Sequence, residues 1–248
     1  MGFQLMKRTM SIQFFMLIPA PKPFNVATIL SSHGLLKSLL NLTYRRSSLI
    51  TMSKVAILCS GEGTLLQAVI DAYANGHLNM QPTIVISNNS QSNSLRRASK
   101  AGLTAWHLCA DHYFGSEEIL DEVTAQLLDG FNVDLVLLLG YMKKIGPSML
   151  LQFPDQILNI HPSLLPKYGG NGMYDLLVHQ AVIKAGDEET GITIHVVDED
   201  YDTGRIIDQI KIPVGLNDTP EILRHKVREL ESSFLIKTLQ EIERRGYV

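Results

Sequence analysis

The chain contains Leu158-Asn159-Ile160-His161-Pro162-Ser163-Leu164-Leu165-Pro166, a strand-like run that is closed by two prolines. Asn159 and His161 are two residues apart, so both side chains project from the same face of an extended segment. Pro162 and Pro166 prevent the segment from continuing as a helix or as a central strand. The pattern therefore predicts a strand end that holds two polar side chains on a rigid base, which is a common position for reactive groups.

Short apolar runs alternate with amphipathic segments on the N-terminal side of this stretch. Periodicity predicts strands at 55–59, 82–87, 104–108 and 134–140, and helices at 65–75, 95–101, 117–128 and 146–153. This alternation is typical of a parallel sheet with helices on both faces.

The C-terminal side has a different pattern. Residues 191–197 and 206–214 alternate as an antiparallel pair around the loop at 198–204, and 220–245 reads as a closing amphipathic helix. Thr219 is a suitable N-cap, and Pro220 suits the first helical position. The predicted fold class is α/β, with a Rossmann-like, mostly parallel sheet flanked by helices, an antiparallel C-terminal portion and a closing helix. Residues 54–248 are expected to form this domain.

Composition limits the classes of partner. The chain has 248 residues, 45% of them hydrophobic, and a net charge of −3, which is ordinary globular composition. Residues 55–248 carry 15 basic and 25 acidic residues, a balance that disfavours non-specific binding of nucleic acid. The two cysteines, Cys59 and Cys109, form no CxxC motif, so no metal site or disulfide framework is expected. We expect small-molecule substrates, no nucleic-acid or membrane partner, and a monomer or homodimer.

The first 53 residues form a leader that we expect to be weakly ordered or to be an over-extended start. Residues 1–54 contain seven basic residues and no acidic residue, and the apolar run at 11–20 is too short to span a membrane. The composition fits an organelle transit peptide over residues 1–51, but Met52 also stands directly before the first strand. A cytoplasmic location is predicted, with an organelle as the alternative.

The turn at Ser60-Gly61-Glu62-Gly63-Thr64 joins a predicted strand to a predicted helix. Backbone N–H groups at such a helix start bind anions, and glycine lets a phosphate approach closely. A dinucleotide fingerprint fails here because its third glycine is replaced by Leu66, and no acidic residue ends the second strand. The turn therefore favours a phosphomonoester over NAD, with a tight turn that binds nothing as the alternative.

Each candidate side chain also has a structural interpretation. His161 alone would be a hydrogen-bonded structural histidine, and Asp202 alone would lie in a solvated acidic loop. His195 fits a buried imidazole that supports the site as well as it fits a functional one. The glycine-rich run at 169–172 is either an inert loop or a lid.

Taken together, the motifs resemble the folate-dependent formyltransferases, in the branch that acts on glycinamide ribonucleotide during purine synthesis. The resemblance covers about Lys54 to Val248. Its strongest elements are the Asn159–Lys167 stretch and Asp202-Thr203-Gly204, supported by Gly140–Ile145 and the Ser60–Thr64 turn.

The resemblance implies a role for each matching position. It implies that Asn159, His161 and Asp202 are catalytic. It implies that the ribonucleotide is bound by Gly61, Gly63, Thr64, Leu65, Arg228 and Glu231. It implies that the pterin is held by Met142, Lys143, Lys144, Ile145, Asp198, Asp200 and Tyr201. The implied co-substrate is 10-formyltetrahydrofolate, and no metal is implied. The sequence departs from the family pattern at Glu62, Leu65, Glu117 and the 169–174 loop.

The implied reaction is direct formyl transfer to an amine. Asn159 and a protonated His161 are expected to donate hydrogen bonds to the tetrahedral oxyanion. Asp202 is expected to raise the pKa of His161 and to order a water that carries the proton. The alternatives are a formyltransferase for another amine, such as an amino-sugar nucleotide, and a nucleotide-binding Rossmann module without catalysis.

Overall fold

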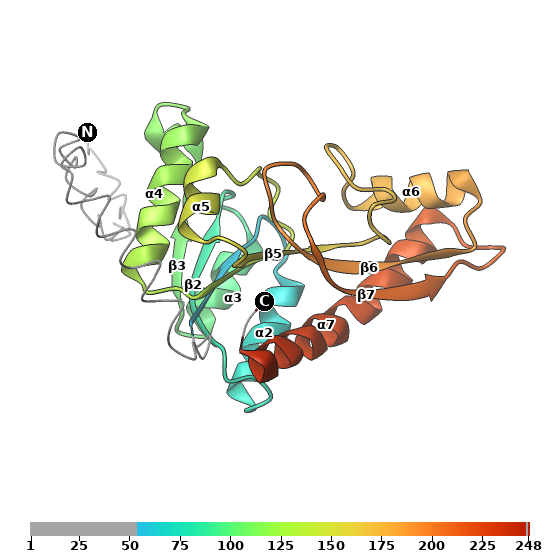
Figure 1. Cartoon of the computed structure of the whole chain (residues 1–248), viewed down its shortest axis with the longest axis horizontal. Helices are drawn as coiled ribbons and strands as arrows, with labels where there is room; N and C mark the ends of the chain where they lie inside the picture. Colours follow the sequence, from blue (N-terminus) through green and yellow to red (C-terminus); the bar gives the residue numbers. More distant parts are fainter. Residues whose placement is uncertain (1–53, 247) are drawn as a thin grey trace, which may run out of the picture. The chain divides into compact units, whose positions relative to one another are not determined.

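The computed structural model describes residues 54–246 and 248, so the expectations for residues 1–53 lie outside the described residues. Its centre is a seven-stranded sheet in the order β3-β2-β1-β4-β5-β6-β7 (Figure 1). The strands are β1 (Lys54–Leu58), β2 (Gln81–Ser87), β3 (Thr104–His107), β4 (Leu135–Leu138), β5 (Ile157–His161), β6 (Glu189–Val196) and β7 (Ile206–Pro213). β1 to β5 pair in parallel, whereas β6 and β7 are antiparallel to their neighbours. The predicted fold class is confirmed.

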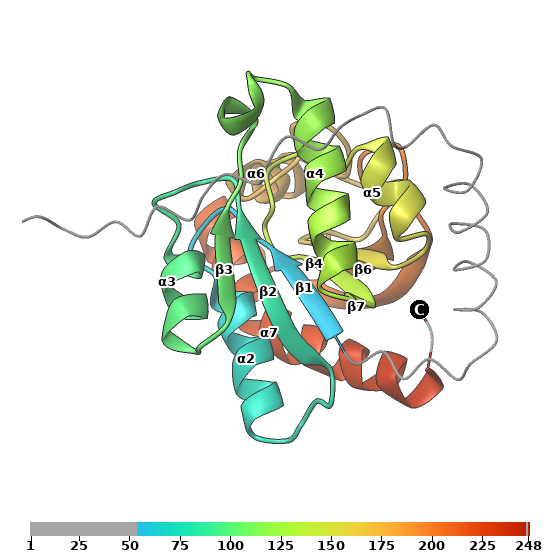
Figure 2. The same cartoon turned by 90° about the vertical axis from the view of Figure 1, so that its left-hand side faces the viewer.

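Helices cover both faces of the sheet. They are α2 (Thr64–Ala74), α3 (Asn93–Lys100), α4 (Glu117–Gly130), α5 (Pro147–Gln152), α6 (Leu176–Ala185) and α7 (Pro220–Arg245), with a 3₁₀ turn, η2 (Ala110–Tyr113). Figure 2 shows α4 and α5 on one face, and α2, α3 and α7 on the other. Val55 and Ile57 of β1 pack on the α2/α7 side, while Ala56 and Leu58 pack on the α4/α5 side. This alternation is the two-residue period of a strand that is buried on both faces.

The helix starts follow their capping residues. Ser116 accepts a hydrogen bond from Ile119 N at the start of α4. Thr219 accepts one from Ile222 N at 3.3 Å, and Pro220 occupies the first turn of α7 as the sequence predicts. None of the helices in the described part of the chain combines the length and hydropathy that crossing a bilayer requires.

The order of the strands defines where a ligand can enter. From β1 the chain moves outward through β2 to β3, and then returns to the other side of β1 with β4. The connections therefore diverge at the carboxyl ends of β1 and β4, which is the position where open α/β sheets bind ligands. Ser60 N donates to Gly140 O at 3.1 Å, so the two loops that leave this point are tied together.

Candidate active site

Three polar side chains meet where β5 approaches the loop between β6 and β7. Asn159 and His161 lie on β5, and Asp202 belongs to the loop. The Asp202 carboxylate lies 3.5 Å from His161 Nδ1 and 3.3 Å from Asn159 Nδ2. The structure thus brings together the three side chains that were expected to be catalytic, although Asp202 is 43 positions from Asn159.

His195 completes this cluster from β6, where it is paired with Asn159 across the sheet. His195 Nδ1 lies 2.8 Å from the carbonyl oxygen of Val196, so Nδ1 carries the hydrogen and Nε2 is an acceptor. Asn159 Nδ2 lies 3.1 Å from this Nε2 and donates to it. The geometry favours the supporting role for His195, because its buried ring fixes the orientation of the Asn159 amide.

A backbone carbonyl orients the ring of His161. Nε2 lies 2.8 Å from Tyr168 O and carries the hydrogen, so Nδ1 of the neutral ring is bare and faces Asp202. Burial lowers the pKa of His161 below its ordinary value, although Asp202 and the Tyr168 carbonyl act in the opposite direction. Asp202 thus raises the pKa of His161 as expected, but burial outweighs this contribution, so the ring is neutral rather than protonated in the chain without substrate.

Asp202 has a left-handed backbone with φ of 60°, a conformation that aspartate and asparagine tolerate better than most residues. Its Oδ2 accepts a hydrogen bond from Gly170 N at 2.9 Å. Burial alone would raise the pKa of Asp202, but His195, His161 and the Gly170 N–H together hold it below its ordinary value. The carboxylate is therefore ionised at neutral pH. Glycine is required at Gly204 because a Cβ there would collide with the carbonyl oxygen of Val196.

A small pocket of about 60 Å³ opens beside the cluster. It gathers six of the seven residues expected to hold the pterin, namely Lys143, Lys144, Ile145, Asp198, Asp200 and Tyr201, together with Asn159, His195 and Asp202. Met142 is half-exposed and does not line the pocket, but its backbone N–H donates to Ser60 Oγ at 2.9 Å. The pocket is much smaller than the roughly 300 Å³ of a typical ligand site. A ligand the size of a pterin would therefore fit only if the loop after β4 and the loop after β6 moved apart.

Two contacts hold these loops. Lys144 Nζ lies 5.7 Å from the centre of the Tyr201 ring, which joins the loop after β4 to the loop after β6. Lys143 Nζ lies 2.6 Å from Glu117 Oε1, at the start of α4. This hydrogen bond raises the pKa of Lys143. Glu117, a departure from the family pattern, therefore acts through Lys143 at the mouth of the pocket.

The predicted phosphate turn connects β1 to α2. Gly63 is the N-cap of α2 with φ of 69°, and no side chain caps the N–H groups of the first turn. Leu65 packs its side chain against the core, so only its backbone is available to a ligand. The Glu62 carboxylate is bound by Asn93 Nδ2 at 2.7 and 2.8 Å. Asn93 thus holds the charge that would repel a phosphate.

Arg97, on α3, contacts this turn, and the sequence pattern did not reveal it. Its Nε donates to Glu62 O at 2.8 Å, and its Nη1 donates to Gln67 at 3.2 Å. It comes from α3, 35 positions away from Glu62, and only the folded chain brings its charge to the turn.

Arg228 and Glu231 lie on α7 as predicted, but the contacts of Arg228 among the described residues run to Asp175. Arg228 Nη2 is 2.8 Å and Arg224 Nη1 is 3.3 Å from the Asp175 carboxylate. Asp175 has φ of 46° and ψ of −126°, a backbone conformation that favours glycine. Burial raises the pKa of Glu231, with Arg228 opposing the rise and Asp175 adding to it. Asp175 was not predicted from the sequence, because nothing in the 169–175 run distinguishes it.

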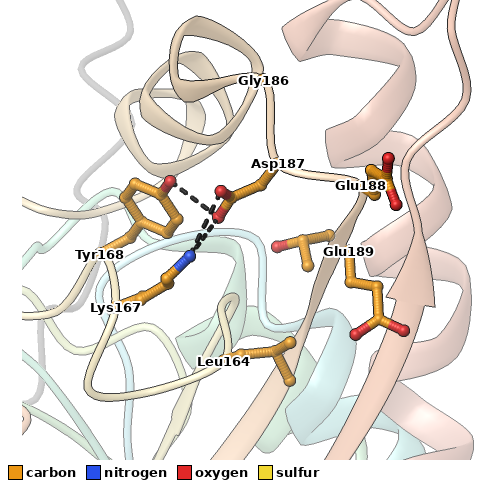
Figure 3. Close-up of a pocket in the computed structure, with 8 residues that line it drawn as sticks. Leu164, Lys167, Tyr168, Gly186, Asp187, Glu188 and Glu189 are labelled. Carbon is orange, nitrogen blue, oxygen red and sulfur yellow. Dashed lines mark hydrogen bonds and ion pairs between the residues drawn. The ribbon is translucent and has the colours of Figure 1, made fainter.

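A second cavity lies elsewhere, between β6 and the end of α6 (Figure 3). It measures about 490 Å³ and none of the expected site residues lines it. Its wall nevertheless anchors the active site, because Tyr168 Oη donates to Asp187 at 2.9 Å and Lys167 pairs with the same carboxylate at 3.0 Å. These contacts fix the segment whose carbonyl orients His161.

Comparisons with known proteins point to one family. The formyl transferase model matches residues 53–239. The chain is 39% identical over 180 residues to phosphoribosylglycinamide formyltransferase of Haemophilus influenzae, covering 73% of this chain and 82% of that protein. It is 34% identical over 186 residues to the chloroplastic phosphoribosylglycinamide formyltransferase of Arabidopsis thaliana, covering 75% of this chain and 64% of the plant protein. Glycinamide ribonucleotide transformylase 1 from Symbiobacterium toebii superposes with a TM-score of 0.73 at 34% identity, over 78% of this chain and 89% of that structure.

Proposed function

This chain belongs to the formyl transferase family, and we propose that it transfers the formyl group of 10-formyltetrahydrofolate to the amine of glycinamide ribonucleotide in purine biosynthesis. The observation that carries the proposal is the meeting of Asn159, His161 and Asp202 beside the small pocket lined by Lys143–Ile145 and by the loop after β6. The choice of glycinamide ribonucleotide as the acceptor is supported by the relatives, since both sequence relatives are phosphoribosylglycinamide formyltransferases.

The amine of the acceptor attacks the formyl carbon, and the carbonyl oxygen becomes an oxyanion. The Asn159 amide is the donor that supports this charge. In the free chain its two N–H groups go to His195 Nε2 and Asp202 Oδ1, at 3.1 and 3.3 Å. The longer of these bonds is the one that the oxyanion replaces. One such donor contributes about 10²–10³-fold to turnover in comparable sites.

The proton of the attacking amine passes to the bare Nδ1 of His161. The neutral ring faces a carboxylate at 3.5 Å, which favours the ring once it is charged. The protonated ring then donates to the folate nitrogen as the bond between that nitrogen and the formyl carbon breaks. The proton leaves the amine and ends on the folate, and no covalent intermediate with the protein forms.

The ribonucleotide phosphate is bound by the turn after β1 and by Arg228. Uncapped N–H groups at Thr64 and Leu65 and the open space beside Gly61 support this assignment, whereas the missing side chain of Gly63 makes room for Ser94 of α3. In the free chain the Asp175 carboxylate pairs with the Arg228 guanidinium, with Oδ1 2.8 Å from Nη2. The phosphate therefore takes the place of this carboxylate when the ribonucleotide binds. Glu231, which burial makes a weaker acid, is the group we assign to the ribose or amine end.

A transfer assay tests the function directly. Release of the folate product from 10-formyldideazafolate is followed by absorbance with glycinamide ribonucleotide or with an amino-sugar nucleotide as acceptor. We expect turnover with the ribonucleotide. Faster turnover of the amino-sugar nucleotide would assign the other acceptor, and absence of transfer to either would leave a binding module.

Substrates of this class are small molecules. We propose that the chain acts as a monomer or homodimer and needs no other partner. A cytoplasmic location stays a prediction, with an organelle as the alternative if residues 1–51 form a transit peptide. One of the relatives is chloroplastic.

A further inference from the structure

We propose that His107, Cys109 and His112 form a binding site for a zinc-class transition-metal ion. Their ligand atoms, two imidazole nitrogens and one thiol sulfur, all lie within 4.8 Å of one another. The cluster lies at the end of the edge strand β3, outside the residues that the reaction uses. The proposal does not depend on the proposed function.

The backbone brings the three side chains to one side. His107 ends β3 and Cys109 follows two residues later with an extended backbone, so both side chains share a face. Cys109 is also the N-cap of η2, and His112 N donates to Cys109 O at 3.1 Å. Residues three apart in a 3₁₀ turn are superposed, which places His112 beside Cys109. In the sequence His-x-Cys-x-x-His, the two-residue period of the extended segment and the three-residue period of the 3₁₀ turn therefore bring all three side chains together.

The segment is well anchored at its base. Leu108, between the first two ligands, is buried, and its N–H donates to Ser87 O at 2.9 Å. The ligand side chains themselves are less constrained, because the His107 and Cys109 side chains are half-buried and that of His112 is exposed. Among the described residues neither imidazole has a hydrogen-bond partner, and the two rings meet edge to face at 4.8 Å.

The donor set selects the metal. Imidazole and thiolate are borderline and soft ligands that suit zinc, whereas calcium and magnesium take oxygen ligands. Zinc bonds of about 2.0–2.3 Å require ligand atoms roughly 3.3–3.6 Å apart, so the three atoms must close by about 1 Å. Rotation of partly exposed side chains is sufficient for this. Three protein ligands leave the fourth position of a tetrahedral ion to water or to another small ligand.

The site is tested with zinc and cobalt on the full, tag-free chain after treatment with a chelator. We expect one zinc per chain by calorimetry, and a cobalt complex with a thiolate-to-metal charge-transfer band. Cys109→Ser and His112→Gln should each weaken zinc binding by at least about tenfold. His77→Gln, at an exposed histidine outside the cluster, is the matched control and should bind as the unmodified chain does.

A second readout needs no substitution at the thiol. Zinc should slow the reaction of Cys109 with a disulfide reagent in the unmodified chain, and should not do so in His112→Gln. Cys59 is buried in the core and contributes little to this signal. Zinc binding that is equal in all variants, a cobalt spectrum without the thiolate band, or an unprotected thiol in the presence of zinc would each overturn the proposal.

Discussion

Asp202→Asn isolates the charge of the carboxylate from its shape. Asparagine tolerates the left-handed φ of 60° as aspartate does, so the loop keeps its conformation. The amide oxygen at the Oδ2 position still accepts the Gly170 N–H and faces Nδ1 of His161, and the amide nitrogen at the Oδ1 position lies beside Nε2 of His195, to which it can donate. The His161 ring keeps its surroundings, but the negative charge that would stabilise the protonated ring is absent.

The expected loss follows from the proton transfer that depends on this charge. A positioned acid–base group contributes about 10²–10⁴-fold, so kcat should fall by that factor, or by about 3–5 kcal/mol of activation free energy. The Asp202 carboxylate contacts none of the residues assigned to the phosphate. The KM for the ribonucleotide should therefore stay within about twofold of its original value.

Steady-state transfer from 10-formyldideazafolate measures both constants. Glu199→Gln is the matched control, since it makes the same carboxylate-to-amide change at an exposed residue of the same loop that does not line the pocket. The control should keep most of its turnover. The proton-transfer argument is refuted if Asp202→Asn keeps more than about a tenth of the original kcat, or if both variants lose activity equally.

Five further substitutions test the neighbouring structure. Gly204→Ala should destabilise the loop by about 3 kcal/mol or more in urea unfolding, whereas Gly130→Ala, which has open space at the end of α4, should be neutral or stabilise by up to about 1 kcal/mol. His179 is buried, its Nδ1 has no partner among the described residues, and burial lowers its pKa from 6.5 to about 4. Its folded-state pKa is depressed, so stability present above pH 6.5 is lost as pH falls toward 4; urea unfolding at both ends of this window should show about 3 kcal/mol less loss in His179→Leu. Arg228→Gln should raise the KM for the ribonucleotide about 10–100-fold, whereas Asp175→Asn, which frees the guanidinium, should lower it about two- to fivefold in the same kinetic assay. A lower KM in Arg228→Gln, or a higher one in Asp175→Asn, would contradict the exchange of carboxylate for phosphate.

Periodicity was sufficient for most of the fold because most strands and helices have a clear apolar pattern. The run at 134–140 was predicted as a strand and contains β4, and the Thr219–Pro220 start of α7 was correct. The sequence did not predict α6 (Leu176–Ala185). This helix begins after Asp175 without a side-chain cap and carries apolar residues around much of its circumference, so neither the cap nor a polar face marks it.

The site was predictable only in part. The spacing of Asn159 and His161 shows in the sequence that they share a face, but Asp202 was assigned through the family resemblance alone. The orientation of the His161 ring depends on the carbonyl of Tyr168, seven positions later, whose φ of 58° is itself unusual. No residue type signals a carbonyl direction. The sequence also did not show how deeply His161 is buried, and this burial outweighs the correctly predicted contribution of Asp202 and lowers the pKa of the ring.

The unliganded site is internally paired, and this has a consequence for the order of events. Both N–H groups of the Asn159 amide are occupied, and Nδ1 of His161 faces a carboxylate without a proton between them. When the oxyanion accepts the Asn159 N–H that was bonded to Asp202, the negative charge of the carboxylate loses one hydrogen bond. Its attraction for a protonated His161 then becomes stronger. Formation of the oxyanion and protonation of the ring therefore favour each other. The His161 ring, which burial keeps neutral in the free chain, becomes charged only when the amine attacks, when that charge stabilises the intermediate rather than the bound substrates.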